Sequence, residues 1–148
     1  MKILIAYGSL GKFFHLKEFS EALQKLDVQT MLVKDSDYST GFPSKKPKEW
    51  IGTNKKFKNL IDEFKPDAVF IDRQSHFGID TIKFKIPLFI LLRGHYWSEI
   101  EWAKKTLYKG PLMRTVIWFR NNIAEKCFRN ATAVLPICEY LEDVVKEH

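Results

Sequence analysis

The chain has 148 residues, of which 24 are Lys or Arg and 18 are Asp or Glu, so its formal net charge is +6, and 45% of its residues are hydrophobic. A chain of this length can bury one substantial core without disulfides or metals, which excludes disordered, collagen-like and low-complexity classes. Cys127 and Cys138 fit neither a zinc spacing nor a disulfide framework. The longest apolar stretch, residues 86–92, is too short to span a bilayer. We therefore expect a soluble cytoplasmic protein, peripheral to a membrane at most.

Apolar runs and helical patterns alternate along the first half of the chain. Residues 2–7 are apolar almost throughout, which is typical of a parallel strand buried on both faces. A helix is predicted over residues 15–26, a strand over 28–34 and, because periodicity is lost there, an exposed loop over 35–48. A helix near residues 57–64, ended by Pro66, then precedes a third strand over 67–72.

The same alternation continues to the end. A fourth strand is predicted over residues 86–92, and Ser98 with Glu101 forms a capping box that predicts a helix over about 99–108. A second helix over 112–128 follows Gly110-Pro111, then a strand over 131–137 and a helix over 139–148. The pattern predicts an α/β fold: a Rossmann-like open parallel sheet of five strands in the order 2-1-3-4-5, with helices on both faces.

Ligands of such sheets bind beyond the carboxyl ends of the strands, at the switch point between the first and third strands. After the first strand, Gly8, Ser9 and Gly11 lead into a helix whose amino end favours an anion. Leu10 and Phe13 occupy two glycine positions of the dinucleotide fingerprint. Asp35 or Asp37 nevertheless keeps a nicotinamide-dependent oxidoreductase open, and the two glycines could serve the turn alone.

Two polar segments follow the third and fourth strands, and they supply the remaining candidate substrate-binding residues: Asp72, His76, Arg93, Gly94, His95, Tyr96, Trp97 and Glu99. Arg93 suits a phosphate or carboxylate, the histidines suit proton transfer, and the aromatic rings suit the face of a sugar. The alternative is structural: Arg93 pairs with Asp72 or Glu99, and the histidines cap backbone groups.

Positive charge gathers in two clusters. Six lysines in residues 45–58 are opposed there by Glu49 alone, which is typical of a solvated face. Residues 101–129 contain more apolar side chains than one core-facing stripe needs, together with basic ones, and this predicts either a partner domain or an interfacial membrane site. The candidate membrane-docking residues are Lys104, Lys105, Lys109, Arg114, Trp118 and Arg120.

Four segments together resemble the N-terminal domain of GT-B fold glycosyltransferases, in the retaining group similar to glycogen synthases and mannosyltransferases. They are residues 1–11, Lys65-Pro66-Asp67 with the strand after it, Ile86-Pro87-Leu88 continuing to Arg93-Gly94-His95, and residues 130–134. The resemblance implies that residues 1–148 are one Rossmann-like domain, the acceptor-side half of a two-domain enzyme whose donor-binding domain lies beyond His148. His95 would be the catalytic residue near the transferred sugar.

The resemblance also implies partners. The donor would be a nucleotide sugar acting as co-substrate, the acceptor a lipid, glycan or small molecule, and no metal or other cofactor would be needed. The domain would be inactive alone and could dock on an anionic membrane. The alternatives are a non-catalytic, membrane-docking binding module and an NAD-dependent oxidoreductase domain. Nucleic acid is not an expected partner, because the charge is modest and no recognition motif is present.

Overall fold

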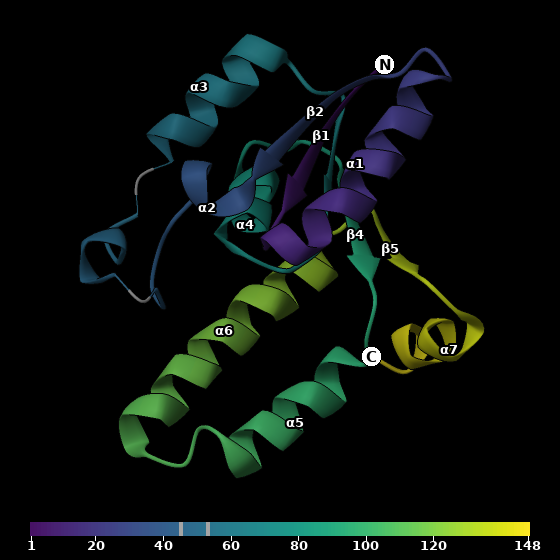
Figure 1. Cartoon of the computed structure of the whole chain (residues 1–148). Helices are drawn as coiled ribbons and strands as arrows, with labels where there is room; N and C mark the ends of the chain where they lie inside the picture. The colour runs from purple at the N-terminus through teal and green to yellow at the C-terminus, as the bar shows by residue number, and fades with distance from the viewer. Residues whose placement is uncertain (45, 53) are drawn as a thin grey trace.

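The computed structural model describes residues 1–44, 46–52 and 54–148. Its centre is a five-stranded parallel sheet with the order β2-β1-β3-β4-β5, which confirms the predicted fold class (Figure 1). The strands are β1 (Lys2–Tyr7), β2 (Gln29–Lys34), β3 (Ala68–Ile71), β4 (Leu88–Leu92) and β5 (Ala133–Pro136). Each lies inside the range that its apolar run predicts.

Two apolar clusters hold helices on the two faces of the sheet. The larger one joins β1, β3 and β4 to α3 (Lys55–Phe64), α4 (His76–Lys83) and α6 (Pro111–Arg129), through buried residues such as Phe57, Phe77 and Cys127. The smaller one packs Leu16 of α1 (Leu10–Gln24) against Ile5 and Phe70. The last helix, α7 (Glu139–Glu147), packs beside the edge strand β5.

Helix α4 is absent from the sequence-based prediction. Ser75 caps its start by accepting a hydrogen bond from the backbone N–H of Phe77 at 3.3 Å. Gly78 interrupts the helical pattern for a packing reason, because a Cβ at this position would lie 2.8 Å from Cys127 Sγ. Propensity disfavours glycine in a helix, and here close contact with α6 decides the residue.

Residues 35–48 were expected to form an exposed loop, and this is wrong in part. Asp35–Tyr38 form a short helix, α2, and Pro47–Glu49 form a 3-10 turn, η1. Asp35 and Ser39 are buried. Residues 35–44 therefore fold back along the carboxyl edge of the sheet, where Phe42 contacts His76, and residue 45 lies outside the described residues.

Two predicted helix starts are also corrected. Helix α1 begins at Leu10, directly after β1, so Gly11 lies inside the helix and not in a loop. Helix α5 (Tyr96–Thr106) begins before the predicted capping box, because His95 and not Ser98 is its N-cap. The ring Nδ1 of His95 accepts the backbone N–H of Ser98 at 3.2 Å, so an imidazole performs the capping role expected of a hydroxyl.

Helices α5 and α6 form a hairpin that projects beyond the carboxyl ends of the strands (Figure 1). No residue of α5 is buried, and α6 buries only Ile117, Ala124 and Cys127. The predicted excess of apolar residues is confirmed here by the exposure of Trp102, Leu107, Leu112, Met113, Trp118 and Phe119. Within the described part of the chain, no helix combines the length and the apolar character needed to cross a membrane.

Candidate functional site

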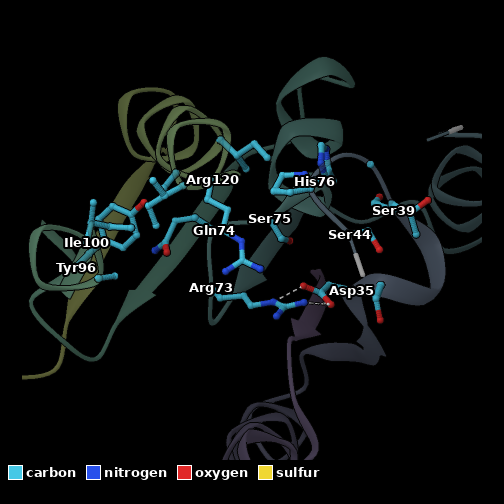
Figure 2. Close-up of a pocket in the computed structure, with 18 of the residues that line it drawn as sticks. Asp35, Ser39, Ser44, Arg73, Gln74, Ser75, His76, Tyr96, Ile100 and Arg120 are labelled. Atoms are coloured by element: carbon cyan, nitrogen blue, oxygen red, sulfur yellow. Dashed lines mark hydrogen bonds and ion pairs between the residues drawn. The ribbon is translucent and has the colours of Figure 1, made fainter. Parts of the chain in front are cut away.

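A pocket of about 510 Å³ lies at the carboxyl edge of the sheet, which is where ligands bind in folds of this kind. Its walls come from segments far apart in the sequence: α2 and the loop after it, the turn between β3 and α4, and the α5–α6 hairpin. Figure 2 shows side chains from these segments facing a shared space. The volume falls within the roughly 300–1,000 Å³ common for small-molecule sites.

Arg73 and Asp35 line one side of this pocket as an ion pair (Figure 2). Arg73 Nε and Nη2 donate to the two carboxylate oxygens of Asp35 at 2.7 and 2.9 Å. The Asp35 side chain is 4% exposed, whereas that of Arg73 is 45% exposed. The fork geometry fixes the guanidinium plane while leaving Nη1 free of this pair.

The loop after α2 forms a second wall and is tied to the turn between β3 and α4. His76 Nε2 donates to the backbone oxygen of Phe42 at 2.9 Å. A Cβ at Gly41 would lie 2.5 Å from the His76 ring, so the loop backbone packs directly on the imidazole. Ser39 adds a buried hydroxyl oxygen with no hydrogen-bond partner among the described residues.

The hairpin supplies the third wall, which is mostly aromatic and apolar. Arg120 Nη1 donates to the hydroxyl of Tyr108 at 2.7 Å, and its guanidinium carbon lies 5.9 Å from the centre of that ring. The Tyr96 hydroxyl donates to Asn121 Oδ1 at 3.4 Å, and burial raises the pKa of Tyr96. The wall therefore offers two phenol groups and one cation to a ligand.

A second polar group lies at the switch point between β1 and β3. Asp72 Oδ1 accepts the backbone N–H of Gly8 at 3.0 Å, and Lys12 Nζ lies 3.8 Å from Oδ2. Burial raises the pKa of Asp72 although Lys12, the Gly8 N–H and Arg73 act in the opposite direction. A Cβ at Gly8 would lie 2.3 Å from Arg73 Cδ, so the arginine side chain covers this turn.

The structure divides the predicted substrate-binding residues into three groups. Gly8, Ser9 and Asp72 meet at the start of α1, with Gly11 inside that helix. His76, Tyr96 and Glu99 line the pocket, and Glu99 folds over Gly94, where a Cβ would lie 2.5 Å from its Oε1. Arg93, Gly94, His95 and Trp97 are not among the pocket-lining residues.

His95 lies in an aromatic cluster beside the C-terminal helix. Its ring centre is 6.0 Å from that of Tyr140 and 6.4 Å from that of Trp97. Trp97 stacks on His148 at 4.2 Å and on Phe128 at 5.1 Å. The capping bond and these contacts explain His95 structurally, and its catalytic role stays a prediction.

The predicted ion pairs of Arg93 do not form within the described residues, since neither Asp72 nor Glu99 pairs with it there. Of the predicted membrane-docking residues, Arg120 lines the pocket, and the other five are exposed along the hairpin: Lys104, Lys105, Lys109, Arg114 and Trp118. In the same described part of the chain, no three His, Cys, Asp or Glu side chains are grouped so as to hold a metal ion.

Several pocket residues were not predicted as a site, above all Arg73, Ser39 and Tyr108. Arg73 follows the end of β3 by two residues, so its position at a strand end was the available signal. Ser39 and Tyr108 gave no comparable signal, because they reach the pocket through a loop and a hairpin whose directions depend on tertiary packing.

Comparisons with known proteins correct the functional interpretation. A stretch of 73 residues is 37% identical to the ribosomal RNA small subunit methyltransferase Nep1 of Pyrococcus furiosus, covering 43% of this chain and 33% of that protein. The chain thus spans about a third of the length of this relative. No family model matches the chain, and no solved structure matches it.

The predicted membership of the GT-B glycosyltransferases is therefore wrong, because the relative is a methyltransferase. The prediction of a nucleotide sugar with its acceptor as partners falls with it, and so does the exclusion of nucleic acid, because the name of the relative specifies an RNA. The error arose because the segments behind the resemblance are the strand ends of a parallel α/β sheet, which many protein families share.

Proposed function

We propose that this chain is an RNA-binding α/β domain whose carboxyl-edge pocket receives a single nucleotide. The observation that carries the proposal is the pocket itself, which has a volume of about 510 Å³ and is lined by Arg73, Arg120, Tyr96 and Tyr108. RNA-binding proteins recognise unstacked nucleotides by aromatic or guanidinium stacking together with hydrogen bonds to base edges. The pocket contains both kinds of group.

The two arginines have different tasks in this proposal. Two N–H groups of the Arg73 guanidinium already donate to Asp35, so the Arg73 side chain serves mainly to shape the pocket. Arg120 is exposed and uses one N–H for Tyr108, which leaves further donors for a phosphate. Gln74 and His76 line the pocket as polar groups suited to a base edge.

The similarity to a ribosomal RNA methyltransferase supports RNA as the ligand class. The net charge of +6 favours a polyanion in the same way. We assign RNA recognition to this chain, and no chemical step, because the similar region spans only 33% of that enzyme.

Fluorescence anisotropy with a labelled short single-stranded RNA tests the proposal. We expect binding to weaken as salt rises from about 50 to 200 mM. A plot of the logarithm of the association constant against the logarithm of the salt concentration should have a slope of roughly −0.7 per phosphate contact. Arg120→Gln should weaken binding by about tenfold, since a charge-assisted hydrogen bond to phosphate is lost.

Arg129→Gln is the matched control, because Arg129 lies at the far end of the same helix with its side chain 81% exposed and outside the pocket. The proposal fails if the wild-type protein does not bind RNA at low salt. It also fails if the two arginine variants lose affinity equally, since the pocket would then have no special role.

The hairpin favours a second candidate function, docking on an anionic membrane from the aqueous side. Its exposed apolar residues include Trp102 at 60%, Leu112 at 72% and Trp118 at 59% exposure. Lys104, Lys105, Lys109 and Arg114 are exposed on the same hairpin. Apolar side chains that enter the interface, with cations facing anionic headgroups, are the features of an interfacial site.

Vesicle sedimentation tests this second function. The protein should sediment with vesicles that contain phosphatidylserine and much less with pure phosphatidylcholine, and Leu112→Ser with Trp118→Ser should abolish the difference. Arg129→Gln again serves as the control. If equal fractions of the wild-type and doubly substituted proteins sediment with the phosphatidylserine vesicles, membrane docking by the hairpin is refuted.

A further inference from the structure

Trp50 lies at the rim of the pocket in a fixed orientation. Its indole N–H donates to the backbone oxygen of Ser44 at 2.8 Å. Ser44 and Glu49, the residue before Trp50, both line the pocket. The Trp50 side chain is therefore an immediate neighbour of the pocket mouth, although it is not part of the lining.

The Trp50 ring packs against one aromatic neighbour and keeps about half of its surface exposed. Phe42 packs against it edge to face, with ring centres 5.0 Å apart, and Phe42 packs in the same way on Phe119 of α6 at 4.9 Å. Trp50 nevertheless remains 47% exposed. An indole held by a hydrogen bond and an aromatic contact, with much of its surface in water, is already arranged for stacking.

Lysines flank Trp50 on both sides in the sequence. Glu49 pairs with Lys46 at 3.4 Å, and Asp62 pairs with Lys58 at 2.9 Å. Lys48, Lys55 and Lys56 are exposed and have no acidic partner among the residues that the structure describes. Lys45, which belongs to the same sequence cluster, lies outside the described residues.

We infer that Trp50, Lys48, Lys55 and Lys56 bind single-stranded RNA next to the pocket, with one base stacked on Trp50 and the neighbouring phosphates on the three lysines. This inference rests on the proposed function and names the substrate class of that site. A base inside a duplex has both faces covered by its neighbours, so an indole can reach only an unpaired one. Aromatic platforms beside lysines are the usual means of holding a single strand.

Anisotropy with one labelled RNA, single-stranded and as its duplex, tests the inference. Trp50→Ala should weaken single-strand binding by about tenfold, and Trp50→Phe should retain most of the affinity, because every base can stack on an aromatic face. Trp102→Ala is the matched control, since Trp102 is 60% exposed on α5, away from the platform. Circular dichroism melting of each variant shows that the fold is kept.

Salt dependence separates stacking from charge. Lys55→Gln combined with Lys56→Gln should reduce the salt slope by about 1.4, twice the roughly 0.7 expected for one phosphate on a single strand. Trp50→Ala should leave the slope unchanged while lowering the affinity. A change of slope in Trp50→Ala would show that the ring acts through charge placement, which contradicts stacking.

The outcomes for the pocket and the platform can be distinguished. Loss of affinity in Arg120→Gln but not in Trp50→Ala overturns the platform and leaves the pocket standing, whereas the reverse result overturns the pocket alone. Duplex binding as tight as single-strand binding overturns the substrate class. A wild-type protein that ignores RNA, or that uses Trp50 to bind phosphatidylserine vesicles instead, overturns the inference entirely.

Discussion

Replacing Arg73 with methionine tests whether the ion pair beside the pocket holds this edge of the fold together. Methionine keeps most of the length and apolar stem of arginine and removes the guanidinium. The Asp35 carboxylate, whose side chain is 4% exposed, then loses donors at 2.7 and 2.9 Å. A nearly buried anion remains without the partner that neutralised it.

The magnitude follows from how much of the pair is buried. Removing one partner of a fully buried ion pair destabilises a protein by about 3–5 kcal/mol. The Arg73 side chain is 45% exposed, so water can solvate part of the stranded carboxylate. We therefore expect Arg73→Met to lower the free energy of unfolding by about 2 kcal/mol, or the melting temperature by about 4–8 °C in a chain of this size.

Urea unfolding at neutral pH measures this change, with Asp35→Asn as the second arm of a double-mutant cycle. Adding Asp35→Asn to Arg73→Met should recover about half of the lost free energy of unfolding, because the unpaired buried carboxylate is then replaced by a neutral amide. Lys58→Met is the control, since Lys58 and Asp62 are both 59% exposed and their pair should contribute less than about 0.5 kcal/mol. If Arg73→Met costs no more than this control, the pair has no structural role.

Three further predictions concern buried groups. Gly78→Ala should destabilise the protein by about 1–3 kcal/mol, because its Cβ would lie 2.8 Å from Cys127 Sγ. Unfolding experiments should show part of this loss recovered by Cys127→Ala. Because burial raises the folded-state pKa of Asp72, its ionisation weakens the fold. The stability gained by Asp72→Asn should then be largest at neutral pH and shrink as the pH falls through that pKa, and a pH-independent difference would contradict this. Finally, a thiol reagent should modify exposed Cys138 quickly and Cys127 only on unfolding, since Cys127 is buried and its pKa is raised to about 12. Two fast thiols in the native protein would show that the α4–α6 contact opens.

Much of the candidate site could not be predicted, for a physical reason that particular residues illustrate. Asp35 and Arg73 are 38 positions apart and form two hydrogen bonds, because β2 and β3 lie on either side of β1 and all parallel strands end at the same edge of the sheet. Position at a strand end was a readable signal for both residues. Nothing local indicates that the loop with Gly41 packs on His76, or that Arg120 reaches Tyr108 across the hairpin.

The resemblance that led to a glycosyltransferase shows the same limit for function. The short segments behind it describe how the chain enters and leaves a strand, as with Gly8 after β1 and Pro87 before β4. Backbone geometry imposes these residues on many α/β proteins of unrelated activity. Such segments therefore predict where a ligand lies and not which ligand it is.

The amino-acid sequence by itself determined the five strands, their parallel order and the edge at which a site would form. Continuous apolar runs must be covered on both faces, and right-handed crossovers then leave few arrangements. Only the tertiary structure decided which polar groups share the pocket, which of the described lysines pair with a carboxylate and how much of Trp50 stays exposed. Those properties depend on contacts between distant segments, and their free energies arise only when the whole chain has packed.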